Sequence, residues 1–466
     1  MRLLSISLRN LRIRFVATVL TMMSIVVATA LYASILTMAE QTEARYEGSI
    51  GGYQAILGPN GASELELVLN AIFNIGDSPG LIPLEVCQQM REQKRVGRIR
   101  RTRVRYAIPQ ARGDSVSRFN FPVVATLDEM FSKFEWHREP LKFQAGRPFH
   151  YSWEQLLELA EALARHENGV RAHEAEPPPR PQLQKEWREC VIGARVARSL
   201  SLGIGATITP VHGKRNEFGY HEHHEAACQV VGILAPTNSP IDSTIYLPLG
   251  VHLLIDGHEG GVFVDKLVPG KSKDMVKELP TSAGRIGLTA VILDPLDHLG
   301  PRILRSEFGT HPEAQVAWPQ GVIPKFLQQI GNAADALAVI AWLVLLVAAV
   351  SITVAIYNTM NERRREIAIM RSLGARRLQI LTIITGEAAL LSLFGALFGI
   401  ALCHLAQWGL QPLVEDLTGV YLDWAIFRPW ELYLVAGVTA VGAFAGLAPA
   451  VKGSMTQVAD NLAQNY

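Results

Sequence analysis

The sequence lacks any large net charge and contains few cysteines. Its 44 lysine and arginine residues nearly balance 43 aspartate and glutamate residues, so the formal net charge is +1. We expect no nucleic-acid partner. Of the 4 cysteines, Cys87, Cys190 and Cys228 fall in one segment and Cys403 lies apart. At most one disulfide can therefore form within that segment, and no spacing specifies which cysteines it joins.

Two motifs that would indicate an enzyme are also missing. A phosphate-binding loop needs a glycine, four residues and then Gly-Lys-Ser/Thr, but Gly270-Lys271-Ser272 is preceded by Asp265 at the first glycine position. A zinc hydrolase motif of the His-Glu-x-x-His type would need histidine where Glu225 stands. We therefore expect no enzyme activity, and no bound ATP, in this chain.

Charge is also nearly missing from four long apolar stretches, of which the third is interrupted only by Glu387. A helix that crosses a membrane core of roughly 30 Å needs about 20 residues at about 1.5 Å per residue, and each stretch is long enough to supply them. The first could instead be a signal peptide cleaved after Ala28-Thr29-Ala30, but its apolar run exceeds the about 7 to 15 residues of a signal core. We interpret it as a permanent anchor. The stretches are Phe15–Ala39, the residues between Asp335 and Glu362, Leu378–Val414 and Leu432–Val451.

Arginine is concentrated on one side of these stretches. Arg2, Arg9, Arg12 and Arg14 precede the first stretch, and six arginines lie in the short connection Met360–Arg377. Basic residues are retained on the cytoplasmic side, where the inner leaflet is anionic. We therefore predict a multi-pass protein of the cell inner (plasma) membrane, with both termini cytoplasmic and residues 40–335 extracytoplasmic.

The predicted fold is an α-helical membrane domain with four transmembrane helices plus a large mixed α/β extracytoplasmic domain inserted between helices one and two. In the external segment, hydrophobic periodicity predicts helices at Leu65–Phe73 and Trp153–His166 and short strands at Val230–Leu234 and Thr244–Leu247. The predicted domains are 1–39 (cytoplasmic N-terminus and helix one), 40–335 (extracytoplasmic) and 336–466 (helices two to four).

Three groups of residues at the two ends of the chain resemble the permease domain of the MacB/FtsX-like ABC transporter family. These are Glu362–Ala375, the third-span residues Gly386, Glu387, Ala388, Gly395 and Gly399, and Gly446–Ala450 with Lys452, Gly453 and Ser454. Three external segments resemble the extracytoplasmic domain of a subgroup: Gly58–Ser63, Val191–Ala197 and Val231–Thr237. Residues 336–466 are therefore identified as an FtsX-like permease domain.

The resemblance implies a mechanism. In this family two permease chains pair, dock onto a dimer of ATPase subunits and transmit nucleotide-driven closure to external domains. The implied partners are a separate ABC ATPase subunit that binds ATP, a second copy of this chain and a periplasmic adaptor or lipoprotein. The implied ATPase-coupling residues are Glu362, Arg363, Arg364, Arg365, Glu366, Arg371 and Gly374.

Two interpretations of the arginine-rich connection stay open, because the arginines alone would set the topology. Ile367, Ile369, Met370 and Leu373 nonetheless fit an amphipathic helix along an interface. In the third span, Gly395 and Gly399 allow close helix approach and are candidates for the dimer seam. Glu387 is the carboxylate embedded in that span, where it could cap a helix, pair with the arginines or line the seam.

A histidine-rich segment is the second local signal. His212, His221, His223 and His224 lie close together with carboxylates in the sequence, a composition that can bind Zn²⁺. A solvated polar loop without metal is the alternative. The leading function is export or extraction of an envelope or lipophilic substrate. The alternatives are a non-transporting mechanotransmission regulator of an external hydrolase and a metal-linked envelope function.

Overall fold

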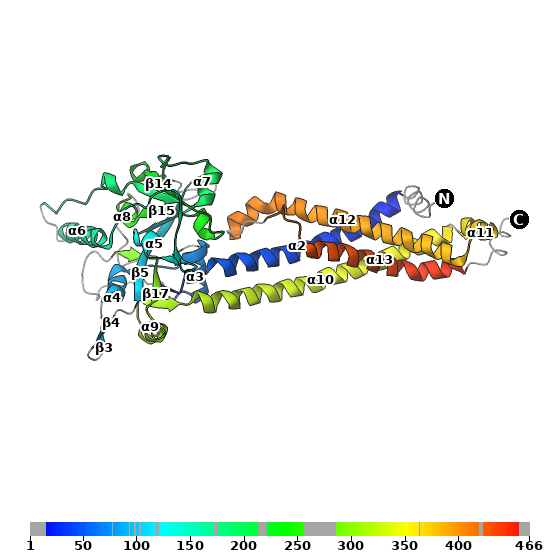
Figure 1. Cartoon of the computed structure of the whole chain (residues 1–466), viewed down its shortest axis with the longest axis horizontal. Helices are drawn as coiled ribbons and strands as arrows, with labels where there is room; N and C mark the ends of the chain where they lie inside the picture. Colours follow the sequence, from blue (N-terminus) through cyan, green and yellow to red (C-terminus); the bar gives the residue numbers. More distant parts are fainter. Residues whose placement is uncertain are drawn as a thin grey trace. The chain divides into compact units, whose positions relative to one another are not determined.

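The computed structural model describes residues 15–455, apart from residues 77, 93, 97–98, 102–103, 117–120, 172–175, 213–220, 256–285, 363 and 419–422. The chain divides into two compact units (Figure 1). The helical unit comprises Met1–Glu43 and Gln328–Tyr466, and the α/β unit comprises Ala44–Leu327. The segment Gly270–Ser272 with Asp265 lies outside the described residues.

Among the described residues, four long helices and one short helix form the helical unit. They are α2 (Phe15–Ser49), α10 (Pro319–Glu362), α11 (Arg364–Ser372), α12 (Arg377–Thr418) and α13 (Pro429–Ser454), of which α2 and α10 continue into the α/β unit. Four segments are long and apolar enough to cross a membrane: Thr18–Ala44, Pro319–Asn358, Arg377–Val414 and Pro429–Lys452. The four apolar spans predicted from the sequence are therefore present as helices.

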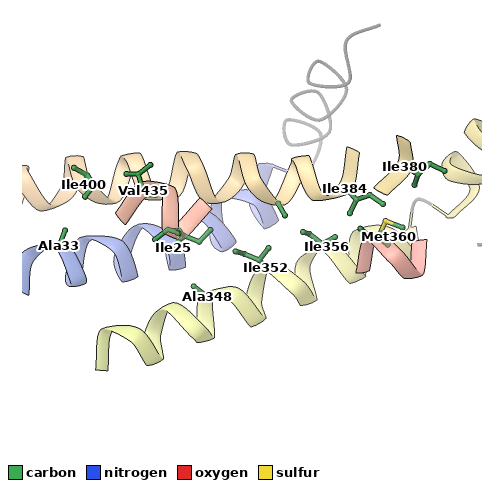
Figure 2. Close-up of a cluster of buried hydrophobic side chains, with 14 of the residues drawn as sticks. Ile25, Ala33, Ala348, Ile352, Ile356, Met360, Ile380, Ile384, Ile400 and Val435 are labelled. Carbon is green, nitrogen blue, oxygen red and sulfur yellow. The ribbon is translucent and has the colours of Figure 1, made fainter. Parts of the chain in front are cut away.

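A buried hydrophobic cluster holds these helices together (Figure 2). Ile25 of α2, Ile352 and Ile356 of α10, Ile384 of α12 and Val438 of α13 all belong to it. Large apolar side chains also cover the opposite, exposed faces of the same helices, including Leu343, Leu346, Val350, Phe398, Leu405 and Phe444. A helix that is apolar on all sides is suited to a lipid surrounding.

Side-chain hydroxyls inside the helical unit donate to main-chain carbonyls. Thr353 Oγ1 of α10 lies 3.0 Å from the carbonyl oxygen of Ala349 and 3.0 Å from that of Ala445 on α13. Ser392 Oγ similarly donates to the carbonyl of Ala388 at 2.9 Å. These bonds satisfy polar groups that have no water to bind within a membrane.

The α/β unit is built on a mixed, mostly antiparallel sheet. Its described strands follow the order β11-β14-β10-β15-β6-β5-β17-β1-β18. In addition, β9 pairs with β14, and β12 pairs with both β5 and β13. The strands are β1 (Ala55–Pro59), β5 (Val104–Val116), β6 (Phe121–Thr126), β9 (Phe143–Gly146), β10 (Glu189–Ile192), β11 (Thr207–Ile208), β12 (Val211–His212), β13 (His221–Glu222), β14 (Cys228–Leu234), β15 (Ile245–Pro248), β17 (Ala290–Pro295) and β18 (Ala314–Ala317). The pairs β10–β14 and β15–β6 are parallel.

Helices pack against this sheet and confirm several local predictions. The expected helices are present as α3 (Glu64–Phe73) and α6 (Trp153–Arg171), and the expected strands as β14 and β15. The further helices are α4 (Leu84–Arg91), α5 (Glu129–Ser132), α7 (Ala194–Leu200), α8 (Leu249–Leu254) and α9 (Gly300–Phe308). Short strands β2 (Ile82–Pro83), β3 (Lys94–Val96), β4 (Ile99–Arg101), β7 (Glu135–Trp136), β8 (Glu139–Pro140) and β16 (Gly287–Leu288) form separate two-stranded pairs.

Two half-buried arginines fix helix ends in the α/β unit. Arg112 of β5 donates to the carbonyl oxygens of Asn70 and Ala71 near the end of α3. Arg91, the last residue of α4, binds both carboxylate oxygens of Glu129 at 2.7 and 2.6 Å. These charge-assisted bonds satisfy carbonyl and carboxylate groups that the fold removes from water.

The cysteines do not form disulfides among the described residues. Cys87, Cys190, Cys228 and Cys403 are all free and buried. Burial raises the pKa of the Cys87 and Cys228 thiols to about 12, which disfavours the reactive thiolate form. The chemistry of the chain is therefore not expected to depend on these thiols.

Candidate coupling site between α10 and α12

The arginine-rich connection folds into the short helix α11. Its C-terminal end is a Schellman turn, in which the Ala375 N–H donates to the Met370 carbonyl and the Gly374 N–H donates to the Arg371 carbonyl. Gly374 has φ +96°, a left-handed conformation that glycine adopts without a Cβ penalty. The sequence places glycine where the chain must reverse between α11 and α12.

The next helix begins with a side-chain cap. The Gln379 side chain accepts the backbone N–H of Arg376 at 2.9 Å, three residues before it. This is the glutamine half of a capping box, which satisfies one of the free amide groups at a helix start. The end of α11 and the start of α12 are both fixed, so the connection has one defined geometry.

One face of α11 is packed into the helical unit. Ile367 and Ala368 are 3% and 1% exposed, and Ile367 belongs to the same buried cluster as Met360 of α10 and Ile380 of α12. Met370 packs against this cluster. Figure 2 shows Met360, Ile380 and Ile384 gathered where α10 and α12 approach each other. A force applied to α11 would therefore reach both long helices through direct side-chain contact.

The opposite face of α11 remains apolar and exposed. Leu373 is 82% exposed, Ile369 is 43% exposed, and Leu378 at the start of α12 is 72% exposed. The sequence analysis placed Ile367, Ile369, Met370 and Leu373 on one interface, whereas the structure divides them between an inner and an outer face. We name Ile369, Leu373 and Leu378 the outer apolar face of the connection.

The side chains of several predicted coupling residues lie outside the described residues. Arg363 lies outside the described residues, and so do the side chains of Glu362, Arg364, Arg365 and Glu366, although Glu362 ends α10 and Arg364 begins α11. Arg376 and Arg377, close to the outer apolar face in the sequence, are exposed. The charged part of the predicted site stays a prediction.

A contact that the sequence did not reveal joins α10 and α13. Lys452 Nζ lies 2.9 Å from Tyr357 Oη and 4.7 Å from the centre of the same ring. Tyr357 precedes the end of α10 by about one turn of helix, and Lys452 lies near the end of α13. Residues so far apart in the chain carry no joint sequence signal, so their pairing could be found only from the fold.

The third-span glycines pack against α2 of the same chain. A Cβ atom on Gly395 would lie 2.8 Å from the Cβ of Ile25, and one on Gly399 would lie 2.6 Å from the Cβ of Thr29. The two glycines therefore permit an intrachain helix contact, and their role in a dimer seam stays a prediction. Glu387, on the same helix, is buried and 6% exposed.

The histidine-rich segment is only partly described. Strands β12 and β13 pair with His212 opposite His221, but the side chains of these two residues lie outside the described residues. His223 is buried, with Nδ1 3.2 Å from Glu225 Oε1, whereas His224 is largely exposed. Within the described ranges, no group of three or more His, Cys, Asp or Glu residues is arranged to hold a metal ion. Zinc binding stays a prediction.

Comparison with known proteins matches the part of the chain that contains this site. Residues 338–457 match the family described as FtsX-like permease C-terminal. A stretch of 119 residues is 34% identical to a protein named uncharacterized ABC transporter permease MJ1507 from Methanocaldococcus jannaschii. That match covers 25% of this chain and 29% of the relative. Residues 338–457 are therefore similar to the FtsX-like permease C-terminal family, as the sequence resemblance predicted.

Proposed function

We propose that this chain is the permease subunit of an ABC transporter and that α11 receives the motion of a separate ATPase subunit. The observation that carries the proposal is that the apolar residues of α11 and of the turn after it are divided between a buried face and an exposed face. Ile367 packs inside the helical unit, while Leu373 is exposed beside a run of arginines. An exposed apolar face flanked by charge is typical of a protein interface.

The proposed topology places this site in the cytoplasm. The six arginines of the connection favour the cytoplasmic side, where ATP is available to a partner. The α/β unit follows α2 and precedes α10 in the chain, so we place it outside the cytoplasm, between the first and second spans. Two chains and two ATPase subunits form the proposed complex.

The proposed output is movement of the external unit. We favour export or extraction of an envelope or lipophilic substrate, because residues 44–327 form a unit larger than a simple regulatory bridge would need. The non-transporting alternative, in which the same motion activates an external hydrolase, uses the same coupling site. A periplasmic adaptor or lipoprotein is the expected external partner in the first case.

A crosslinking experiment tests the coupling site. A photoreactive amino acid at Leu373 or Ile369, in the full chain in its native membrane, should capture a nucleotide-binding subunit that mass spectrometry identifies. The same probe at Ile204, an exposed aliphatic residue of the α/β unit, is the control and should not capture that subunit. Equal capture at Leu373 and Ile204, or capture of no ATPase at either Leu373 or Ile369, would contradict the proposal.

A functional readout accompanies the crosslink. Leu373→Asp should reduce permease-dependent ATPase activity, since a carboxylate would have to lose its water at an apolar interface. Ile204→Asp should leave the activity near the wild-type level. Normal ATPase activity in Leu373→Asp, with normal membrane insertion, would exclude this face as the contact.

A further inference from the structure

A polar cluster joins α12, the segment before α13 and the first turn of α13. His404 of α12 places Nδ1 2.6 Å from the carbonyl oxygen of Trp424 and Nε2 3.1 Å from Oε2 of Glu431. The other carboxylate oxygen of Glu431 accepts the backbone N–H of Arg428 at 3.2 Å. Glu431 is 2% exposed, so these contacts replace its contact with water.

The two contacts of the His404 ring determine how many protons the pair contains. A main-chain carbonyl oxygen can only accept, so Nδ1 must carry a hydrogen toward Trp424. A neutral imidazole has one N–H, which leaves Nε2 as an acceptor facing the carboxylate of Glu431. An ionised carboxylate is also only an acceptor. The 3.1 Å contact is therefore a hydrogen bond only when one further proton lies on Nε2 or on Glu431.

The charges around the pair also favour the presence of one further proton on His404 or Glu431. Arg428 is 8% exposed, and its Nε lies 3.1 Å from Glu40 Oε2, which also accepts the Trp430 indole N–H at 3.0 Å. With the further proton, Glu40, Arg428, His404 and Glu431 together have no net charge. Without it they carry one net negative charge, of which the half-exposed Glu40 shares its part with solvent, while the buried carboxylate of Glu431 faces a neutral imidazole instead of a cation.

Two other titratable groups lie near the pair among the described residues. Asp423 is partly exposed and its carboxylate accepts the Ala425 N–H at 3.2 Å. Cys403 is the neighbour of His404 in α12 and contacts Ser34 and Gln407. Asp423 adds negative charge and Cys403 is neutral as a thiol. Neither Asp423 nor Cys403 supplies a positive charge that could replace the further proton, so the His404–Glu431 pair still requires that proton.

The start of α13 indicates where the proton lies. Glu431 is in the first turn of this helix and accepts the N–H of Arg428, the residue before Pro429. This is the acidic half of a capping box, and the positive end of a helix favours an ionised carboxylate. We propose that His404 and Glu431 form a proton-binding site that holds an imidazolium next to a carboxylate.

The site makes the contact between α12 and the start of α13 depend on a proton. Release of that proton would leave Nε2 and Glu431 as two acceptors facing each other, and the contact would weaken. Glu40 of α2 is joined to the same cluster through Arg428 and Trp430, so three helices respond together. The proposed function places this contact between α12 and α13 at the external end of the two helices. The proposal of a proton-binding site rests on the contacts alone and does not depend on that placement.

Nitrogen-15 magnetic resonance on the full chain in lipid bilayers tests the site. Histidine ring nitrogens labelled with ¹⁵N distinguish imidazolium from neutral imidazole, and His404→Asn identifies the signals of this residue. At about pH 7, an uncoupled histidine is mostly neutral because its ordinary pKa is about 6.5. We expect both His404 nitrogens to carry hydrogen at this pH in the wild type.

Glu431→Gln supplies the matched variant. A glutamine amide can donate to Nε2, so the hydrogen bond survives without the further proton and His404 should become neutral with hydrogen on Nδ1. Glu186→Gln, at an exposed position of the α/β unit, should leave the His404 signals unchanged. A neutral His404 in the wild type, or an imidazolium retained in Glu431→Gln, would overturn the proposal. The wild-type spectrum decides by itself if that variant fails to fold, and it needs no ATPase.

Discussion

Gly446 of α13 lies directly against Ala388 of α12. A Cβ atom on Gly446 would be 2.6 Å from the Cβ of Ala388, closer than two such carbons can approach. Gly442, one turn earlier, lies in the same way against Ser392. These glycines form a small-residue pattern that allows two apolar helices to approach closely, which is how helices associate within membranes.

The first prediction concerns this contact. Gly446→Leu should lower the thermal midpoint of the full chain in detergent, because overpacking a tight contact costs about 1–3 kcal/mol. Gly437→Leu is the matched control on the same helix, since a Cβ there would meet nothing within 4 Å. Equal midpoints for the two variants would show that the α12–α13 contact is looser than the structure indicates.

The second prediction separates chain packing from dimer formation. Gly399→Leu should destabilise the contact with Thr29 of α2, whereas Gly409→Leu on the same helix should not, because a Cβ at Gly409 meets nothing within 4 Å. Thermal unfolding reports the stability of the chain, and native mass spectrometry reports the assembly. Loss of the dimer with unchanged thermal stability would instead assign Gly399 to the dimer seam.

The third prediction concerns the turn after α11. Gly374→Ala should cost about 1 kcal/mol, because a residue with a Cβ is strained at φ +96° although space around the site is open. Amide hydrogen exchange across Arg364–Ser372 should become faster, and ATPase stimulation should fall with it. Gly331→Ala within α10 is the control and should be neutral or stabilising. Unchanged exchange in α11 would show that the Schellman turn does not hold this helix.

The sequence predicted much of the architecture for a physical reason. Long uncharged stretches such as Leu432–Val451 have few alternatives to a membrane helix, and apolar residues at helical spacing in Trp153–His166 define a helix face. The sequence could not predict the inward faces of the membrane helices. Both sides of these helices are apolar, so hydropathy does not distinguish the inner side from the outer side. The same holds for Ile367 and Ile369 of the short helix α11, of which only Ile367 is buried.

The polar contacts of the helical unit were also beyond sequence reasoning. His404 and Glu431 are separated by the end of α12 and the start of α13, and they meet because those helices are antiparallel neighbours. Pairs of this kind depend on helix register, which hydropathy does not specify.

The last prediction is that acid weakens the contact between α4 and α5. Burial disfavours the charged form of Glu129, but hydrogen bonds from Arg91 and Lys133 outweigh it and hold the pKa of this carboxyl below its ordinary value of 4.5. A group with a lowered pKa in the folded state contributes stability above the ordinary pKa and loses it as the pH falls through the folded value. The contribution is therefore complete at neutral pH, well above 4.5, and is lost in acid as the pH falls through the lowered pKa of Glu129.

Glu129→Gln should remove this pH dependence. At neutral pH the variant should be less stable than the wild type by about 3 kcal/mol, because Arg91 would lose its buried carboxylate partner. In acid, the difference in stability between the variant and the wild type should become smaller. Hydrogen exchange across Leu84–Arg91 in the full chain measures the effect locally. Glu139→Gln provides the control, since Glu139 also has a lowered pKa through Lys142 but is exposed to solvent, and it should leave this exchange unchanged. A constant difference between wild type and Glu129→Gln across the acid range would show that ionisation of Glu129 does not stabilise the α4–α5 contact.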